Sequence, residues 1–549
     1  MRPIRAVGAI LILMGTTLLA QEQATLLWTM RYDGPPSGVD LPAALALAPD
    51  GGIWVTGRSS GVNTGQDILT VGYAPGGAQR RVMRFDAAPP NWDEPADIAI
   101  DDEGNIYVVG SSSSAGIVTL KYSSEGTFQW VRTVSGPLLG EGRACALAGD
   151  SILFVAGRRV NTDFSTDFIV LAYATDGTER WRTTIRADST FENDIVALAV
   201  AAPDRVALCG YLATERIDDL MPFRDIVTIL LNGSGTELWR RQFSEADSAD
   251  DRPVAMGVDA AGNLLVAGMS SGYHRAHEDY LAISYAPDGT ERWWTRYGNP
   301  DLTEDFATDA ETTPGGGLVI TGYGWRDGQE FNFNTVQFDS GGALQWAATW
   351  DGAGRDFAHG LTVDGTGNVY VTGGTREGML GTSSGATVAY DPGGHFRWEA
   401  IYGDPGGNSV YGGDLLVDDS GHVFIMAQAP GDSTGWDYLT LKYRQGVVGL
   451  DRETPLATGF TLHPAYPNPF NPSTTIAFDL PARKRVTLAV YDVLGQPVAT
   501  LVEGPRDAGR HAVVWDGRDQ RGLPVASGVY LVRLGSGDVA QTQKVVLLR

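Results

Sequence analysis

Cysteine is nearly absent from this sequence. Cys145 and Cys209 are the only two among 549 residues, and they form neither a CxxC motif nor an adjacent pair. An exported protein could form a disulfide between them. Free cysteine commonly packs as a small apolar residue, however, and we expect both to lie buried in strands.

Basic residues are also in short supply, and the formal net charge is -25. Residues 460–549 hold ten basic and seven acidic residues and residues 1–5 hold two arginines, so residues 6–459 carry -30. Nucleic acid and anionic lipid both require a basic footprint, which excludes them as partners of this region. Cations and basic partners are allowed, although solubility alone explains such a charge.

Long apolar runs are missing after the first 20 residues. Arg2 and Arg5 precede the apolar stretch that starts with Ala6–Met14, which is the pattern of a secretory signal. We therefore predict a signal peptide over 1–20, with cleavage after Ala20. The stretch is too short to span a membrane, and no other segment approaches the required length, so we expect no transmembrane segment.

Motifs of nucleophilic and metal-dependent catalysis are missing as well. The chain has no Gly-x-Ser-x-Gly elbow, no HExxH and no EF-hand loop. Gly315–Gly317 and Gly365–Gly367 lie at predicted hairpin turns and lack the strand-to-helix context of a phosphate loop. We therefore predict no catalytic residues, no metal ligands and no resident cofactor.

Repetition is what the chain has in abundance. The clearest copy, Ser248–Asp301, contains four strand-length apolar runs, with the hairpin signals Ala260–Asn263 and Pro287–Thr290 inside it. A tryptophan marks the fourth run at Trp130, Trp181, Trp239, Trp293, Trp346 and Trp398. The turn before the second run recurs near Gly51, Gly104, Asp150, Asp204, Gly262, Gly316, Gly367 and Gly421. The period of roughly 50 residues is typical of four-stranded propeller blades.

The last copy ends at Tyr443 with three strands, and an unassigned strand, Leu26–Tyr32, lies at the other end of the chain. A blade shared by the two ends would close a ring through backbone hydrogen bonds. We therefore predict an all-β, eight-bladed β-propeller over residues 24–445, with seven blades as the fallback if one divergent copy is misread.

The repeats resemble the SBBP family of β-propeller repeats. Asn105–Gly110 and Asn368–Gly373 match its Gly-Asn-Ile-Tyr-Val-Thr-Gly signature closely, and Asp-Gly-Thr before the tryptophan matches as well. The resemblance covers roughly Leu26 to Tyr443. It implies the propeller fold and says almost nothing about activity.

Residues 446–459 read as a linker, and residues 460–549 hold short alternating strands that predict a small immunoglobulin-like β-sandwich. This stretch resembles the type A sorting domain of the type IX secretion system. The resemblance is carried by Tyr491–Gly495, Trp515–Gly517 and the sorting-motif residues Tyr466, Pro467, Asn468, Pro469, Phe470, Gly528, Tyr530 and Lys544. It implies export through the periplasm and outer membrane of a Gram-negative bacterium, with the type IX machinery as partner. A similar fold occurs in flagellar hook-capping proteins, but the signal peptide and the C-terminal position favour sorting.

Small side chains in the first strand of each copy place that strand at the ring axis, and the longer acidic connections then share one rim. We predict the ligand site on this rim near the fourth and fifth blades. Its candidate residues are Asp218, Asp219, Phe223, Tyr273, His274, His277 and Glu278. Carboxylates with aromatics suit a sugar or a cationic partner and could hold a metal.

Aspartates recur at two positions of the repeat, before the first strand and before the third. A residue present in most blades makes the same local contact in each, so we expect these aspartates to accept backbone N–H bonds. Asp97, Asp309 and Asp414 share one register of the first strand. They could attract calcium or another divalent cation at the axis, but backbone bonding is the favoured interpretation.

Three functions are open. The leading one is an exported, monomeric, non-catalytic propeller that binds an extracellular glycan or protein at the cell surface or in the medium. The alternative is a secreted propeller enzyme, either a glycan hydrolase or lyase or a quinoprotein-like oxidoreductase. The adjacent cysteine pair frequent in quinoproteins is absent. An outer-membrane assembly scaffold is the third, and it would lack a sorting domain.

Overall fold

The computed structural model describes residues 22–447, with gaps at 35–37, 89–90, 187–192, 215–222, 246–248, 272–276, 300–303, 326–330, 353, 377–380, 405–407 and 432–434. It also describes residues 461–547, with gaps at 463–464, 466–469, 471–473, 481–483, 507–508, 516, 522 and 537–538. The chain forms two compact units, Met1–Val447 and Val448–Arg549. The expected signal segment with its cleavage site at Ala20, and most of the expected linker, lie outside the described residues.

The described residues form strands and no helix, which confirms the all-β prediction. Within the described ranges, no helix has the length and apolarity that a membrane crossing requires. Cys145 and Cys209 are both free and buried, as expected for small apolar packing.

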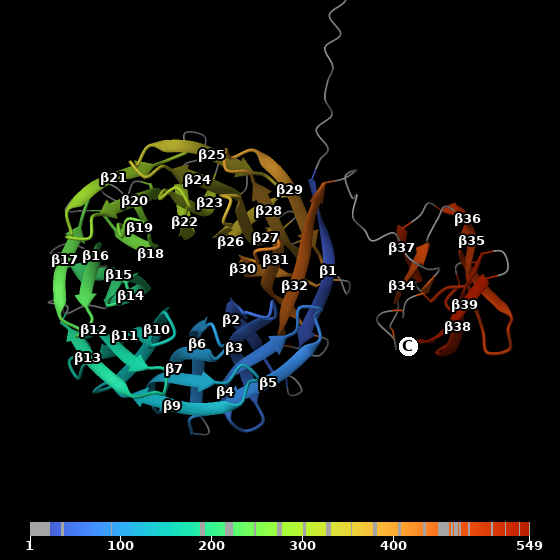
Figure 1. Ribbon diagram of the computed structural model, residues 1–549, viewed down its shortest axis with the longest axis horizontal. Coiled ribbons are helices and arrows are strands. Elements are labelled where there is room, and N and C mark those ends of the chain that lie inside the picture. Colours follow the sequence, from blue (N-terminus) through green and yellow to red (C-terminus); the bar gives the residue numbers. More distant parts are fainter. Residues whose placement is uncertain are drawn as a thin grey trace, which may run out of the picture. The chain divides into compact units, whose positions relative to one another are not determined.

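The first unit consists of antiparallel groups of four strands arranged around an axis (Figure 1). Among the described residues there are eight such groups, which we number as blades 1 to 8. Blades 1 to 4 are built, in chain order, by β2 (Asp40–Leu47), β3 (Ile53–Gly61), β4 (Gly65–Tyr73), β5 (Gln79–Phe85); β6 (Asn91–Ile100), β7 (Ile106–Ser112), β8 (Gly116–Tyr122), β9 (Phe128–Val134); β10 (Leu139–Ala148), β11 (Ile152–Val160), β12 (Thr166–Ala174), β13 (Glu179–Ile185); and β14 (Asp194–Ala202), β15 (Arg205–Thr214), β16 (Phe223–Asn232), β17 (Glu237–Phe243).

Blades 5 to 8 continue the pattern, and blade 8 takes its outer strand from the start of the chain. Their strands are β18 (Asp251–Val258), β19 (Leu264–Ser270), β20 (Asp279–Tyr285), β21 (Glu291–Tyr297); β22 (Glu304–Thr312), β23 (Leu318–Trp325), β24 (Phe331–Phe338), β25 (Leu344–Trp350); β26 (Arg355–Val363), β27 (Val369–Arg376), β28 (Ser383–Tyr390), β29 (Phe396–Tyr402); and β30 (Tyr411–Val417), β31 (His422–Pro430), β32 (Trp436–Val447), β1 (Glu22–Tyr32).

Strand β1 closes the ring. It pairs with β32 from Glu22 opposite Val447 to Tyr32 opposite Tyr438, and Figure 1 shows the blue strand beside the orange one. The pairing joins the two ends of the unit through backbone hydrogen bonds and covers the edge of β32, which would otherwise be unpaired.

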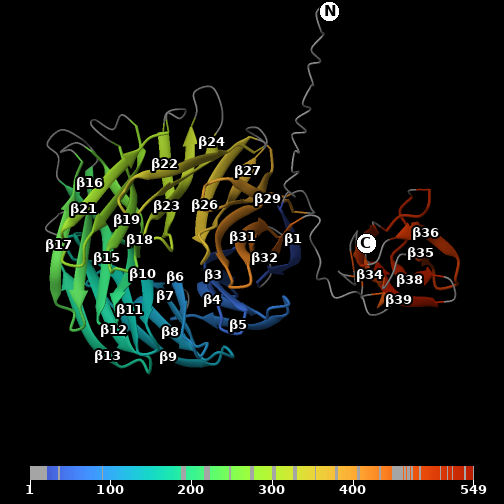
Figure 2. The same cartoon turned by 45° about the horizontal axis from the view of Figure 1, so that its top comes forward.

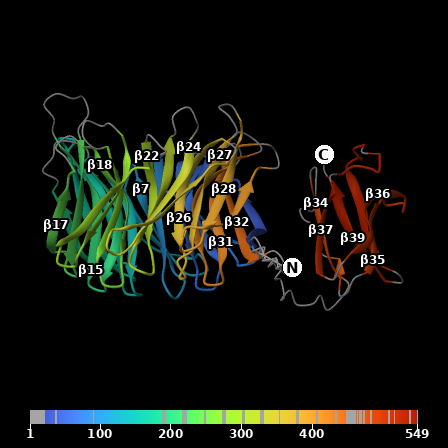
Figure 3. The same ribbon diagram turned by 90° about the horizontal axis from the view of Figure 1, so that it is seen from above.

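The innermost strands, β2, β6, β10, β14, β18, β22, β26 and β30, surround the axis (Figures 1 and 2). Each contains a bulge at the same point, where one extra residue interrupts the register with the second strand. The extra residues are Ala43, Ala96, Arg143, Val196, Val254, Thr308, His359 and Gly413. Strands run between two rims (Figure 3). We call the rim where innermost strands begin the connection rim and the opposite one the turn rim.

Tryptophans of the outer strands join each blade to the next. The indole N–H groups of Trp28, Trp130, Trp181, Trp239, Trp293 and Trp346 donate to the carbonyls of Pro75, Thr175, Gly233, Pro287, Ser340 and Pro392 in the following blade. These donor–acceptor distances are 2.8–3.2 Å. Each acceptor lies in the turn between the third and fourth strands, two residues before a glycine with positive φ. A Cβ on that glycine would lie within 3 Å of the indole, so the Asp-Gly-Thr…Trp motif describes one contact between neighbouring blades.

Two blades depart from this contact. Blade 1 has no tryptophan in β5, and the turn glycine of blade 2, Gly126, faces Met83 and Arg81 instead. Blade 8 has no turn between its third and fourth strands because β1 comes from the N-terminus. There Gln445 replaces the missing carbonyl, and its Oε1 accepts the indole N–H of Trp398 at 3.3 Å.

The second unit is a β-sandwich, as predicted. One sheet contains β33 (Thr461–Leu462), β34 (Thr474–Leu480) and β37 (Gly509–Trp515), and the other contains β36 (Pro497–Arg506), β35 (Lys484–Tyr491), β38 (Gly528–Ser536) and β39 (Val539–Leu547). Alternate residues such as Ile476, Phe478 and Leu480 face the shared core, because successive side chains of a strand point to opposite sides.

The turn glycines should be intolerant of substitution. In a Gly342→Ala variant, the new Cβ would lie 2.6 Å from Trp293, and the residue would keep a φ of 83°. We expect a loss of about 2–4 kcal/mol in unfolding free energy, seen as a lower melting midpoint. Gly149→Ala, with positive φ but nothing within 4 Å of the Cβ, should lose only the backbone part of this energy. Gly365→Ala, with neither constraint, should melt like the wild type. Equal midpoints for all three variants would contradict the contact.

Candidate functional site

A cavity of about 760 Å³ opens on the axis, at the end of the channel nearest the connection rim. Small residues create the space, since Ala43, Ala96 and Gly413 are bulge residues of blades 1, 2 and 8 that line it. Larger side chains come from blades 7 and 8, namely His359, Tyr411, Met426, Gln428 and Trp436. The bulges therefore turn three minimal side chains toward the axis and leave one side of it open.

The aromatic part of the cavity is a ring pair. Tyr411 begins β30 and Trp436 begins β32, and their ring centroids lie 5.6 Å apart with an interplanar angle of 46°. Gly374 stands beside Tyr411, where a Cβ would lie 3.3 Å from the ring. Because both rings sit at the start of a strand, they stand at the mouth of the cavity and present apolar faces beside polar groups.

Three carboxylates of the innermost strands, of which Asp309 and Asp414 line the cavity, accept backbone N–H groups. Asp309 accepts the N–H of Ala310 at 2.8 Å and, across the blade junction, that of Leu361 at 2.7 Å. Asp97 makes the same two bonds to Ile98 and Cys145, each at 2.8 Å. Asp414 accepts the N–H of Leu415 at 2.7 Å. The expectation of backbone bonding is confirmed.

Burial raises the pKa values of these three carboxyl groups. They retain some accessible surface in the channel, yet protein surrounds them. Burial, with a smaller contribution from the Asp414 charge, raises the pKa of Asp309 to about 8. Burial raises the pKa of both Asp97 and Asp414 to about 6. His359 shows the opposite sign, because burial lowers the pKa of its imidazole.

The aspartates before the innermost strands also have the structural role expected of them. Asp40, Asp93, Asp251, Asp305 and Asp356 are at most 1 % exposed. Each accepts a backbone N–H from the preceding connection, at 2.6–2.9 Å. Asn193 takes this position in blade 4, where its Oδ1 accepts the N–H of Ala213 at 2.9 Å.

Three of the aspartates before the third strands form ion pairs with the outer strand, whereas backbone N–H bonds were expected at this position. Asp67 pairs with Arg84 at 2.7 Å, Asp279 with Arg296 at 2.7 Å, and Asp437 with Arg31 at 3.0 Å. The last pair joins the two ends of the first unit, since Arg31 lies on β1 and Asp437 on β32.

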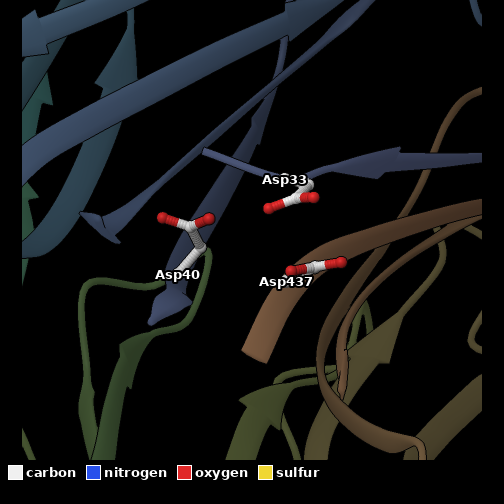
Figure 4. A group of neighbouring side chains, drawn as sticks. All are labelled: Asp33, Asp40 and Asp437. Carbon is white, nitrogen blue, oxygen red and sulfur yellow. The ribbon is translucent and has the colours of Figure 1, made fainter. Parts of the chain in front are cut away.

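At two blade junctions, the aspartate before a first strand and the aspartate before a third strand lie close to a third aspartate. Asp33, Asp40 and Asp437 meet between blades 8 and 1 (Figure 4), and Asp67, Asp86 and Asp93 meet between blades 1 and 2. Within each trio, one oxygen of every carboxylate lies within 4.8 Å of the others. Sequence reasoning missed both trios. The available signal was the aspartate directly after the outer strand, Asp33 or Asp86, which most other copies lack.

The candidate ligand rim at blades 4 and 5 is only partly described. Asp218, Asp219, Tyr273 and His274 lie outside the described residues. Phe223 is 1 % exposed, so its assignment to a binding surface is wrong; the ring is buried in the fold. His277 is exposed. Glu278 bonds Arg252 at 2.7 Å, and burial raises the pKa of its carboxyl group.

The described sorting-motif residues build the sandwich. Phe470 and Tyr530 are buried and both contact Trp515, with centroid distances of 5.3 and 5.2 Å. Gly528 begins β38, and Lys544 is exposed on β39. Tyr466, Pro467, Asn468 and Pro469 lie outside the described residues.

Comparisons with known proteins match parts of the chain. Residues 469–538 match the FlgD Ig-like domain, and residues 88–117 and 351–377 match the family described as Beta-propeller repeat. No curated protein matches.

Solved structures match the chain only at low similarity. PorZ of Porphyromonas gingivalis, titled an essential bacterial surface component of the type-IX secretion system, is 14% identical over 93% of this chain and 74% of its own, with a TM-score of 0.33. The β-propeller domain of the Trilobed protease from Pyrococcus furiosus is 12% identical over 66% of this chain and 94% of its own, with a TM-score of 0.38. Similarity this low says nothing of activity.

Stability of the propeller should fall as pH rises from 5 to 8.5. The raised pKa values of Asp97, Asp251, Asp305, Asp414 and Asp437, each about 6, and of Asp309, about 8, mean that the folded state holds protons which the unfolded chain has released above pH 4. Each pH step in that interval therefore favours unfolding. Melting midpoints measured across the interval should decline.

Asp309→Asn is the matched variant, since it cannot ionise. Its midpoint should lose the decline between pH 6 and 8 and keep the decline below pH 6. A midpoint that rises with pH in the wild type, or an unchanged slope in the variant, would contradict the assignment.

Proposed function

We propose that the protein is an exported binding protein that holds a sugar in the axial cavity of its propeller. The observation that carries this proposal is the composition of the cavity mouth. The ring pair Tyr411 and Trp436 stands beside the polar groups of His359 and Gln428, in a space of about 760 Å³. Such a volume suits a small ligand, and an aromatic face with nearby hydrogen-bonding groups suits a sugar ring.

The second unit delivers the propeller in this proposal. It acts as a type IX sorting domain, recognised by the secretion machinery, and brings the protein to the cell surface or the medium of a Gram-negative bacterium. Support comes from the motif residues and from the match of residues 469–538 to an Ig-like domain. The protein acts as a monomer, because the ring is closed by its own first strand and needs no partner chain.

A glycan-cleaving enzyme is the second candidate, and one observation favours it. Asp309 and Asp414 line the same cavity, and their pKa values differ, about 8 against about 6. Two carboxyl groups with separated pKa values are the arrangement that acid and base catalysis uses. Against this role, both oxygens of Asp309 already accept backbone N–H bonds.

The binding site can be tested with a glycan array probed by the mature chain. Trp436→Ala should weaken binding of any glycan found by about tenfold or more, because it removes an aromatic face of the cavity. Trp294→Ala is the control, since Trp294 lies on the outer strand β21 and is 42% exposed. Equal affinity of Trp436→Ala and the wild type would place the ligand elsewhere. If the wild type releases cleaved glycan products and Asp414→Asn does not, the protein is an enzyme.

Delivery can be tested by truncation. In a bacterium with a type IX system, a chain that ends at Gly449 should fold, since the propeller forms its own compact unit, and should remain in the periplasm. Residues 446–549 fused to a periplasmic reporter should carry that reporter to the surface or medium. Normal delivery of the truncated chain, or retention of the fusion, would refute the sorting assignment.

A further inference from the structure

The junction between blades 1 and 2 gathers three carboxylates from three separate segments. Asp67 comes from β4, Asp86 directly follows β5, and Asp93 comes from β6. Asp67 and Asp93 are both fully buried at 0% exposure. Burial, together with the neighbouring charges of Asp67 and Asp93, raises the pKa of Asp86.

In each of these carboxylates, one oxygen is buried and accepts no hydrogen bond. Asp93 Oδ2 accepts the N–H of Ala87 at 2.8 Å, and Asp67 Oδ2 accepts from Arg84 at 2.7 Å. The Oδ1 atoms of Asp67, Asp86 and Asp93 are buried and accept no hydrogen bond, and the same holds for Oε1 of Gln66. Buried carboxylate oxygens without a partner are costly unless a cation compensates them.

The junction between blades 8 and 1 repeats this arrangement at the closure of the ring. Asp33 follows β1, Asp40 begins β2 and Asp437 lies in β32, so their places in the repeat are those of Asp86, Asp93 and Asp67. Asp40 Oδ2 accepts the N–H of Gly34 at 2.6 Å, whereas its Oδ1 is buried without a hydrogen bond. Figure 4 shows the three carboxylates around one common space.

At the junction between blades 5 and 6 the third aspartate is absent, and side chains donate hydrogen bonds to the other two carboxylates. Asp279 and Asp305 occupy the positions of Asp67 and Asp93 in the repeat, and Gly298 stands where Asp86 and Asp33 stand. Asp305 Oδ1 accepts from Asn334 Nδ2 at 2.8 Å, so no oxygen of this residue is left over. A Cβ at Gly298 would lie 2.6 Å from Asp279 Oδ1, so a side chain at this position points at the carboxylate.

We propose that the two junctions that flank blade 1 each bind one calcium ion. Three carboxylates and one arginine leave a net charge near -2 at each, which a divalent cation neutralises. The free ligands are all oxygens, which selects a hard cation, and they come from three separate segments, which suits the flexible coordination geometry that calcium accepts. Asp33 is exposed and Asp86 half-buried, so water can complete the six to eight oxygens that calcium takes.

The location gives such ions a structural purpose. Blade 1 is the blade whose outer strand lacks the tryptophan, and its other junction is the place where the chain closes on itself. An ion held by Asp67 and Asp86 of blade 1 and Asp93 of blade 2 would tie the two blades where the indole contact is missing. An ion held by Asp33, Asp40 and Asp437 would tie blade 1 to both strands of the closure.

Calcium titration of the chelator-treated full chain tests the proposal, with stoichiometry measured by calorimetry. The wild type should bind two ions, Asp86→Asn one, Asp33→Asn one and the double variant none. Saturating calcium should raise the melting midpoint of the wild type by on the order of 5 °C and leave that of the double variant unchanged. Magnesium at the same concentration should give a smaller shift.

Asp305→Asn is the control for a general loss of stability. It removes a more deeply buried aspartate from a junction without a third carboxylate, so it should melt lower than the wild type and still bind two calcium ions. A wild type that binds no calcium at millimolar concentration would overturn the proposal, as would a double variant that still binds two ions.

Discussion

The ring depends on one repeated contact, the indole of one blade against the turn glycine of the next. It combines a hydrogen bond to a turn carbonyl with an aromatic face, and the rings extend it, since Trp239 stacks on Tyr285 of the next blade at 5.9 Å and Trp346 on Tyr390 at 5.9 Å. Near the axis, neighbouring blades are joined by other contacts, such as the bonds of Asp97 and Asp309 to the next innermost strand. The indole contact fixes their spacing at the outer strands, where the blades are widest apart. The wedge shape that a closed ring needs is therefore set by a tryptophan and a residue without a Cβ.

Where this indole contact is altered or absent, different polar side chains lie at the blade junction. Trp28 extends the contact across the closure because β1 takes the place of an outer strand, and Gln445 supplies with its side chain the acceptor that the missing turn cannot. Blade 1 offers the next turn Met83 and Arg81 of its outer strand and the indole edge of Trp54 from its second strand, but no outer-strand tryptophan. The two aspartate trios lie on either side of this same blade. The closure and the blade without a tryptophan are therefore the places where ionic contacts have the most to add.

Local signals predicted most of the fold. The period of the tryptophans and turn glycines predicted the blades, the three-stranded last copy predicted the shared blade, and alternation predicted the sandwich. The aspartates before the first strands were correctly assigned to backbone bonding, whereas those before the third strands, such as Asp67 and Asp279, pair with arginines instead. The trio at the closure was missed because Asp33 and Asp437 are distant in sequence and adjacent only after the ring closes. Phe223 was misplaced because a phenylalanine next to a long acidic connection resembles a surface residue, whereas its strand position turns the ring inward.

The bulges explain how one scaffold can keep its frame and vary its chemistry. The residues that hold blades together, tryptophan, turn glycine and the buried aspartates, recur with little change around the ring. The bulge residues vary far more, and they range from Gly413 and Ala43 to Val254, Arg143 and His359. Because the bulge residue is the extra one in the register, it is free of cross-strand pairing and can change without disturbing the neighbouring strand. Small residues at this position in blades 1, 2 and 8 open the cavity, and the histidine of blade 7 gives it a polar wall. The lining of the axial cavity is thus varied at a position that the frame does not use.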